Sequence, residues 1–273
     1  MKQYRIGDFA KYLGVTPDLL KHYEELGLVQ SVRRDSGYRY YSFNETMVLI
    51  ESIRLRNFGL TLREISEILK LHKLESEEVD RRLLENMGHM RQEIQLDEAV
   101  IEEYERFLEW KAPLEKHPFD WEIRRSRPVC FLPHTNRFDF LHDSRIYELL
   151  SDWMSYIPVV KSCMKVKEDG QIIWGLSVEE HWLRKLGLPV NDIVEHLPSQ
   201  KVFYYKFRAP LVRTDEETDA ETHPAISLLH SLGLKQNGPY YRVTLMPADW
   251  KQDISRQYGF YAVPLSEYGT EGE

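Results

Sequence analysis

Cysteine is scarce in this sequence, and long apolar runs are missing. Cys130 and Cys163 are the only two cysteines among 273 residues, and neither has a Cys or His neighbour at metal-ligand spacing. A disulfide framework and a zinc module are therefore excluded, and we expect both side chains to be buried. The chain has no apolar run of about 18 residues and already carries charge at Lys2 and Arg5. We therefore expect a cytoplasmic protein without a membrane partner.

Sequence motifs of hydrolases and nucleotide-binding enzymes are missing as well. The chain contains no Gly-x-Ser-x-Gly, no phosphate-binding glycine loop and no His-Glu-x-x-His. The charged run Glu179, Glu180 and His181 is more typical of a solvated helix face than of an acid-base pair. We expect no catalytic residue, no bound metal and no cofactor.

Charge is distributed unevenly along the chain. The formal net charge of -8 by itself argues against a nucleic-acid partner. Residues 1–74, however, hold 12 Lys and Arg against 9 Asp and Glu, a net +3, whereas residues 75–273 hold 24 against 35, a net -11. The basic excess in the first part indicates that this part has a partner of its own.

The basic first part has the pattern of short helices. Apolar residues recur at helical spacing from Ile6 to Leu13, and Gly14 interrupts them. Thr16 is a favourable N-cap with Pro17 at the first helical position, so a second helix begins there and ends at Gly27. Two short helices joined at a glycine-containing turn predict a helix-turn-helix.

A hairpin and two more helices are expected next. Residues 32–41 are β-prone around an Asp-Ser-Gly turn at 35–37, which predicts a hairpin wing. We expect Asn44 to cap a third helix, and the capping-box spacing of Thr61 and Glu64 to begin a fourth. The second helix and the wing would supply hydrogen bonds to bases and phosphates. The candidate DNA-binding residues are Thr16, Lys21, His22, Tyr23, Arg33, Arg34, Tyr38, Arg39 and Tyr40.

Residues 75–110 have the pattern of one long helix. They contain no proline and one glycine, and their apolar side chains recur every seven residues. This heptad pattern predicts a coiled-coil helix of about 30 residues, roughly 45–50 Å long. The row of apolar side chains at the heptad positions, which we call the seam, needs a partner that covers it. The simplest partner is a second copy of the chain in a homodimer, and the alternative is the chain's own C-terminal part. The candidate dimerisation residues are Met87, Met90, Ile94, Ile101, Tyr104 and Leu108.

Pro113 and Pro118 end this helix, and an α+β pattern follows them. A strand, helix, strand succession occurs twice in that pattern. The expected strands span residues 121–132, 171–176, 201–208, 240–246 and 258–264, and the expected helices span 144–156 and 222–232. We divide the chain into a DNA-binding domain (1–74), a dimerisation helix (75–112), a linker (113–120) and a C-terminal α+β domain (121–273).

Five motifs near the start of the chain stand in a distinctive order and spacing. They read Tyr4-Arg5-Ile6-Gly7-Asp8-Phe9-Ala10, Gly14-Val15-Thr16, His22-Tyr23-Glu24-Glu25-Leu26-Gly27-Leu28, Arg33-Arg34-Asp35-Ser36-Gly37-Tyr38-Arg39-Tyr40-Tyr41 and Phe58-Gly59-Leu60-Thr61-Leu62-Arg63-Glu64-Ile65. Over residues 2–72 the sequence closely resembles the MerR family of bacterial transcription regulators. The resemblance implies a winged helix-turn-helix, an antiparallel dimerisation coiled coil and a palindromic site on promoter DNA. Where the family usually reads Arg-Tyr-Tyr-Glu this chain has Lys21-His22-Tyr23-Glu24, so we expect His22 to alter operator preference.

The resemblance also implies a mechanism. In this family the dimer lies between promoter elements that are spaced too far apart for RNA polymerase, and effector binding lets it kink and untwist the DNA so that they realign. A ligand drives such a change only by binding one conformer better than the other. Metal-sensing members carry cysteines near the dimerisation helix, whereas residues 75–116 contain none. We therefore expect an organic effector.

The C-terminal part combines the repeated strand, helix, strand succession with the ending Phe260-Tyr261-Ala262-Val263-Pro264-Leu265. Both features resemble the GyrI-like effector domain of multidrug-sensing MerR regulators. A pocket for a small aromatic or lipophilic effector, such as a drug, needs aromatic walls. The candidate ligand-binding residues are Tyr147, Trp153, Trp174, Trp182, Tyr205, Tyr241 and Phe260.

Two questions stay open at this point. Related effector domains place an acid for cationic drugs where this chain has Phe260. A neutral aromatic ligand is therefore one alternative, and a lipophilic cation held by cation–π contacts from Trp174 or a Tyr, or by a carboxylate such as Glu148 or Glu179, is the other. At the level of function, the alternatives to a ligand-responsive regulator are a repressor that needs no effector and a hydrolase.

Overall fold

The computed structural model of the chain describes residues 2–34, 37–71, 76–137, 139–210, 224–247 and 256–266. The chain divides into two compact units, Met1–Ile94 and Gln95–Glu273, and the long helix α5 (Ser76–Lys111) contributes residues to both. The central residues of the expected wing turn, Asp35 and Ser36, and the first two of the expected helix 222–232 lie outside the described residues. Among the described residues no helix combines the length and apolar character that a membrane crossing requires.

The first unit is a winged helix-turn-helix. Gly14 ends α1 with a φ of 68°, in the left-handed region that glycine adopts without strain, and the Thr16 side chain caps α2 by accepting a hydrogen bond from the Leu19 N–H at 3.1 Å. The expected hairpin is present, because β2 pairs antiparallel with β3, which also pairs with β1. The elements of this unit before α5 are β1 (Gln3–Arg5), α1 (Ile6–Leu13), α2 (Pro17–Glu25), β2 (Val32–Arg33), β3 (Arg39–Ser42), α3 (Asn44–Asn57) and α4 (Leu62–Leu71).

Of the predicted N-termini of α3 and α4, the structure confirms the one of α4 and differs from the one of α3. The capping box of α4 is confirmed, because the Thr61 N–H donates to Glu64 Oε2 at 2.8 Å and the Glu64 N–H donates to Thr61 Oγ1 at 3.3 Å. The expectation that Asn44 caps α3 is wrong. Asn44 is itself the first helical residue, and Phe43 occupies the cap position without a side-chain hydrogen bond.

The second unit is built on an eight-stranded antiparallel sheet in the order β10-β5-β9-β8-β12-β13-β11-β4. The expected repeat is visible in it as β5-α6-β8-β9 and β11-α8-β12-β13, and in each repeat the last strand lies between the first two. Its elements after α5 are the 3-10 helix η1 (Ala112–Glu115), β4 (Phe119–Arg125), β5 (Val129–Pro133), β6 (Thr135–Asn136), β7 (Asp139–Phe140), α6 (Ser144–Ser155), β8 (Lys161–Val166), β9 (Ile172–Glu179), α7 (Glu180–Leu186), β10 (Glu195–Leu197), β11 (Lys201–Pro210), α8 (Pro224–Ser231), β12 (Tyr240–Pro247) and β13 (Arg256–Pro264).

The expectation of a single strand over residues 121–132 is wrong, and the reason shapes the whole sheet. The segment forms β4 and β5, interrupted before Pro128–Val129 because proline has no N–H for a ladder. Six steps of the strand order separate β4 from β5, about 29 Å in a flat sheet, whereas the chain between them spans at most about 14 Å. The sheet must therefore curl until its ends approach, and the Ser126 N–H, which donates to the Gln200 carbonyl at 2.8 Å, continues the β4–β11 ladder into the short connection to β5.

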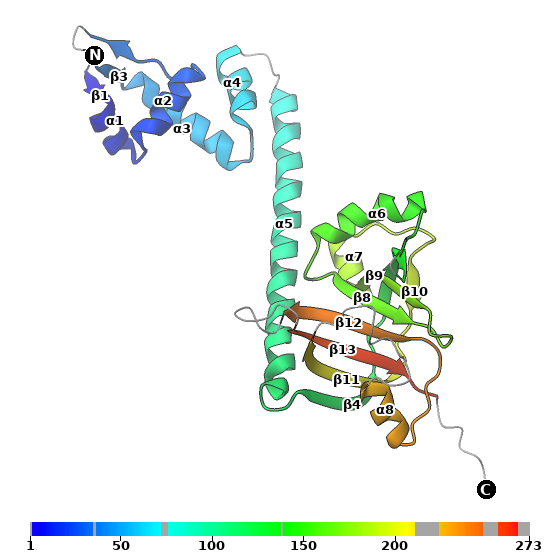
Figure 1. Ribbon diagram of the computed structural model, residues 1–273. Helices are drawn as coiled ribbons and strands as arrows, with labels where there is room; N and C mark the ends of the chain where they lie inside the picture. Colours follow the sequence, from blue (N-terminus) through cyan, green and yellow to red (C-terminus); the bar gives the residue numbers. More distant parts are fainter. Residues whose placement is uncertain are drawn as a thin grey trace. The chain divides into compact units, whose positions relative to one another are not determined.

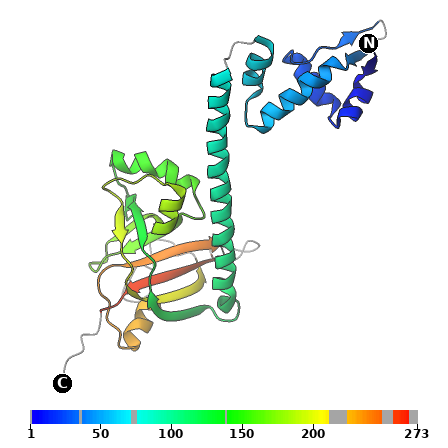
Figure 2. The same ribbon diagram turned by 180° about the vertical axis from the view of Figure 1, so that it is seen from behind.

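Alternation along the strands gives the curled sheet two faces. One face packs against α6 and α7 at the β9 end and against α8 at the β11 end, in two separate cores (Figure 1). The other face is concave, and the view from behind shows the last turns of α5 beside the ends of β12 and β13 (Figure 2). The curl thus creates a partly enclosed space that is lined by the sheet and bordered on one side by α5.

Candidate functional site

The structure places most of the predicted DNA contacts on the exposed surface of α2 and the wing. Lys21 lies 2.8 Å from Asp18, and His22 Nδ1 lies 3.8 Å from Glu25 Oε2. Tyr23 differs, because it lies three residues after Leu20 on the face of α2 that packs into the core, and its ring is fully buried. The exposed members of the predicted set are Thr16, Lys21, His22, Arg33, Arg34 and Tyr38.

The wing is joined to α2 through Glu24. Its Oε2 accepts hydrogen bonds from Arg39 Nε at 2.7 Å and from the Tyr41 hydroxyl at 3.3 Å, and its Oε1 accepts one from the Ser31 hydroxyl. Burial alone would raise the pKa of Glu24, but the hydrogen bonds from Ser31 and Arg39 hold that pKa below its ordinary value. Arg39 is thus a half-buried residue that positions the wing.

Two further basic side chains of the wing region stack on its tyrosines. The guanidinium of Arg34 lies 4.6 Å from the ring centroid of Tyr40, and that of Arg5 lies 4.8 Å from that of Tyr38. Arg5 Nε also donates to the Tyr40 hydroxyl at 3.2 Å. These contacts fix a cluster of basic and aromatic groups at the wing, as phosphate contacts require.

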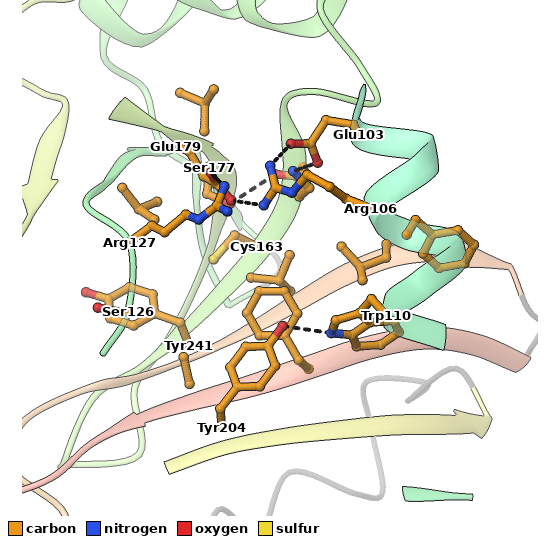
Figure 3. A pocket seen from close by; sticks show the side chains of 18 of the residues that line it. Glu103, Arg106, Trp110, Ser126, Arg127, Cys163, Ser177, Glu179, Tyr204 and Tyr241 are labelled. Atoms are coloured by element: carbon orange, nitrogen blue, oxygen red, sulfur yellow. Dashed lines mark hydrogen bonds and ion pairs between the residues drawn. The ribbon is translucent and has the colours of Figure 1, made fainter. Parts of the chain in front are cut away.

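A cavity of about 530 Å³ lies on the concave face of the curled sheet (Figure 3). Its volume suits an aromatic small molecule. One wall is α5, which contributes Tyr104, Phe107 and Trp110. The aromatic residues of the opposite wall come from three neighbouring strands and are Tyr204, Tyr241 and Phe260.

A hydrogen bond joins the two walls of the cavity. Trp110 Nε1 on α5 donates to the Tyr204 hydroxyl on β11 at 2.9 Å (Figure 3). Burial raises the pKa of Tyr204 well above its ordinary value. The Arg124 guanidinium lies 3.7 Å from the Tyr204 ring centroid, and the Phe260 ring centroid lies 4.6 Å from it. The last turns of α5 are therefore tied to the sheet through the cavity's own lining.

A network of ion pairs borders the aromatic walls. Glu103 on α5 is buried and accepts hydrogen bonds from Lys161 Nζ at 2.7 Å and from Trp182 Nε1 at 2.8 Å. Arg106, one turn further along α5, bridges Glu103 and Glu179 (Figure 3). The network links the helix to β8 and β9, so the position of α5 against the sheet is fixed by charge as well as by packing.

The predicted ligand-binding aromatics are divided by the fold. Tyr241 and Phe260 line the cavity. Trp153 and Trp182 are fully buried in the core that α6 and α7 form with the sheet, where Trp153 Nε1 donates to the Pro189 carbonyl at 2.9 Å. The other three predicted residues also lie outside the cavity lining: Tyr205 and Trp174 are on the α8 face of the sheet, and Tyr147 is exposed to solvent.

The aromatic residues of α5 were absent from the predicted ligand site. Tyr104 belongs to the predicted dimer seam, whereas no role is predicted for Phe107 and Trp110. A signal for them exists in the sequence, because Tyr104, Phe107 and Trp110 recur every three residues and so form one stripe on a helix. The stripe could not be assigned to a cavity without knowing which strands face it.

The two cysteines are buried, as expected. Cys163 lines the cavity, and burial raises the pKa of its thiol to about 12, so it is a neutral wall residue at physiological pH. Within the described parts of the chain, no cluster of three or more His, Cys, Asp or Glu side chains has a geometry that could hold a metal ion.

The predicted dimer seam is uncovered in the single chain. Ile94 and Ile101 each expose 58% of their surface, and Met87, Tyr104 and Leu108 are also exposed. Met90 is partly buried. Exposure of apolar side chains at heptad spacing is what a coiled-coil helix shows before its partner is added.

Some known proteins match the first part of the chain, and others match most of its length. Residues 4–71 match the family described as MerR HTH family regulatory protein. The chain is 31% identical over 111 residues to heavy metal-dependent transcription regulator 2 of Rhizobium meliloti, covering 39% of this chain and 73% of the relative. It is 25% identical over 229 residues to transcriptional regulator BrlR of Pseudomonas aeruginosa, covering 76% of this chain and 81% of BrlR.

A solved structure of EcmrR in complex with DNA has 18% identity and a TM-score of 0.36, with 97% of this chain and 100% of that chain covered. The family match falls on the winged helix-turn-helix, and the relative that is 31% identical is matched over most of its length. The chain therefore belongs to the MerR family of HTH regulatory proteins and is a DNA-binding transcription regulator.

Proposed function

We propose that the protein is a homodimeric, ligand-responsive regulator with a GyrI-like effector domain. It binds a palindromic promoter site, and a small aromatic or lipophilic effector in the cavity changes how the dimer distorts the DNA for RNA polymerase. The observation that carries the proposal is that α5, whose heptad seam is exposed, also forms one wall of the cavity. A ligand in the cavity would contact the dimerisation helix directly.

The two faces of α5 supply the physical basis for coupling. Phe107 and Trp110 face the cavity, while Ile101 and Leu108 belong to the exposed seam. A ligand shifts a conformational equilibrium only by as much as its affinity differs between the two states. A ligand that packs on Trp110, or displaces its hydrogen bond to Tyr204, meets that condition because it favours one position of α5 over another.

Cavity filling tests the effector half of the proposal. Ala262 lines the cavity on β13, so Ala262→Trp should occupy the space that the ligand needs without changing the wing. We expect the intact protein to bind 2-naphthol in calorimetry and the variant to lose that binding, along with any probe-dependent change in transcription, while it keeps operator affinity. Ala112→Trp, at an exposed position in η1, is the matched control.

Unchanged 2-naphthol binding by Ala262→Trp would place the effector site elsewhere. A lack of binding by the unmodified protein, with this and other aromatic probes, would favour a repressor that needs no effector.

Substitutions in the wing test the DNA-binding part of the proposed function. Arg33 is exposed, whereas Arg39 is held by Glu24 at 2.7 Å. We expect Arg33→Ala to weaken binding to operator and unrelated DNA alike, and to reduce the slope of log K against log salt by about 1 per protomer. Arg39→Ala should also weaken binding, and Glu24→Gln should reproduce part of that loss because both variants free the wing from α2. Fluorescence anisotropy across a salt titration measures each slope.

Arg125→Ala, an exposed arginine of β4 in the other unit, is the control and should leave the slope unchanged. A slope for Arg33→Ala equal to that of the unmodified protein would remove the wing from the DNA interface.

A further inference from the structure

The charged side chains that line the cavity do not balance. The lining holds four cationic side chains and three carboxylates, an excess of one positive charge. The excess lies on the two arginines that keep contact with solvent, because Arg127 is 54% exposed and Arg124 is 41% exposed and pairs with Glu122, outside the lining, at 3.4 Å. The cationic residues are Arg106, Arg124, Arg127 and Lys161, and the acidic ones are Glu103, Glu109 and Glu179.

Glu103 is saturated by partners from the protein. Its Oε1 accepts hydrogen bonds from Arg106 Nη1 and Trp182 Nε1, and its Oε2 accepts one from Lys161 Nζ. The side chain is buried. A cationic ligand could use this carboxylate only by displacing Lys161, which would leave that ammonium without its counter-charge in a buried site, or by displacing Arg106, which would then keep only its pair with Glu179.

Glu179 is occupied in the same way. It accepts hydrogen bonds from Arg106 Nη2 at 2.8 Å and from Arg127 Nη1 at 2.6 Å, and His181 Nδ1 lies 3.3 Å from its Oε2. Burial alone would raise the pKa of Glu179, yet the hydrogen bonds from Arg106 and Arg127 hold it below its ordinary value. This part of the lining is therefore positive in character. The third carboxylate, Glu109, is exposed to solvent.

Two of the arginines keep donors for a ligand. Arg127 is about half exposed, with a side-chain exposure of 54%, and within the described residues its side chain donates to Glu179 alone. Arg124 lies over the Tyr204 ring and reaches Glu122 Oε1 only at 3.4 Å. A guanidinium carries five N–H donors arranged to meet a carboxylate, so both side chains can accept a further anionic partner.

We infer that the cavity binds an aromatic ligand with one anionic group, such as an aromatic carboxylate. The ring would pack against Trp110 on α5 and the aromatic side chains of the sheet, and the anionic group would pair with Arg127. This inference rests on the proposed function and names the class of its effector. It separates the protein from binders of lipophilic cations, because neither buried carboxylate of this cavity is free.

Three probes that share one ring system but differ in charge test the inference. 2-Naphthoate is anionic, 2-naphthamide is neutral and 2-naphthylmethylammonium is cationic, and each is titrated into the full chain by calorimetry. We expect 2-naphthoate to bind about tenfold more tightly than 2-naphthamide, and the cation to bind more weakly than both. In Arg127→Gln the advantage of the anion over the amide should fall to about twofold or less, with the amide affinity retained.

Two variants separate charge from folding. Arg127→Lys keeps the positive charge and should keep the preference for the anion. Arg125→Gln, exposed on β4 and outside the lining, should bind all three probes as the unmodified protein does.

The outcomes of the titrations are distinct. Equal affinity for the three probes, tightest binding of the cation, or an unchanged anion preference in Arg127→Gln would overturn the inference while leaving an aromatic effector in place. Failure of all three probes to bind the unmodified protein would count against the proposed function itself.

Discussion

Replacing Glu103 with glutamine is expected to lower the free energy of unfolding of the second unit by about 3 kcal/mol, because it leaves Lys161 without its buried counter-charge and removes one of the two carboxylates that pair with Arg106. Glu103 is only 8% exposed and pairs with Lys161 at 2.7 Å and with Arg106. Glutamine keeps the size and one acceptor for Trp182 Nε1, so the loss reports the charge. Urea denaturation followed by tryptophan fluorescence measures it.

The matched control for this variant is Glu105→Gln, an exposed position two residues along the same helix, where the change should stay within about 0.5 kcal/mol. Adding Lys161→Met to Glu103→Gln should recover part of the lost stability, because it removes the cation that was left unpaired. Equal effects of Glu103→Gln and Glu105→Gln would show that the network does not hold α5 to the sheet.

The termini of the short helices could be predicted from sequence because local chemistry decides them. Thr16 caps α2 whatever the rest of the chain does, Gly14 supplies the left-handed residue after α1, and Thr61 and Glu64 satisfy each other's backbone N–H groups. Asn44 has the same preference for a cap, but the preceding wing strand ends so close to it that the helix starts one residue earlier. At this position the preceding strand, and not the capping preference of Asn44, decides where the helix begins.

The cavity could not be predicted, because it depends on which strands meet. Tyr204 and Tyr205 are adjacent in sequence, yet Tyr204 lines the cavity and Tyr205 packs on the α8 face. Strand β8 was not predicted at all. Its concave-face residues include Lys161 and Lys165, whose charges obscure the alternating apolar pattern of a strand. They form ion pairs with Glu103 and Glu195, which come from distant parts of the sequence.

Tyr104 shows why the dimer seam and the ligand site overlap in sequence. It fits the heptad pattern, half of its surface is exposed, and it also borders the cavity. A coiled-coil pattern uses two positions in seven, so the remaining surface of α5 is available for a second contact. In this chain the sheet takes up that surface around the aromatic stripe, so the predicted dimer seam and the cavity lining occupy different faces of one helix and share Tyr104.

Gly175→Ala is expected to destabilise the second unit by about 3 kcal/mol, since the added methyl group has no room. A Cβ at Gly175 would lie 2.4 Å from the Leu132 carbonyl oxygen and 2.6 Å from Cε2 of the Phe131 ring. The carbonyl belongs to the β5–β9 ladder and cannot withdraw without breaking it. Gly259 in β13 is enclosed in the same way, 2.5 Å from Cζ of Phe207, so Gly259→Ala should behave alike.

Gly7→Ala is the control, because a Cβ there meets nothing within 4 Å and the residue is helical, so stability should be unchanged or rise by up to about 1 kcal/mol. Gly175 and Gly259 lie in β9 and β13, the middle strands of the two repeats, and each leaves room for a phenylalanine ring from a neighbouring strand to approach the backbone closely. Phe131 in turn packs edge-on against Tyr241, which lines the cavity. Chemical denaturation should therefore show a loss of stability for both strand glycines, and Gly175→Ala should also weaken 2-naphthol binding through Phe131 and Tyr241. Stability equal to that of Gly7→Ala would mean that the sheet accommodates the added methyl groups, and unchanged 2-naphthol binding by Gly175→Ala would mean that the packing of Phe131 does not support the cavity wall.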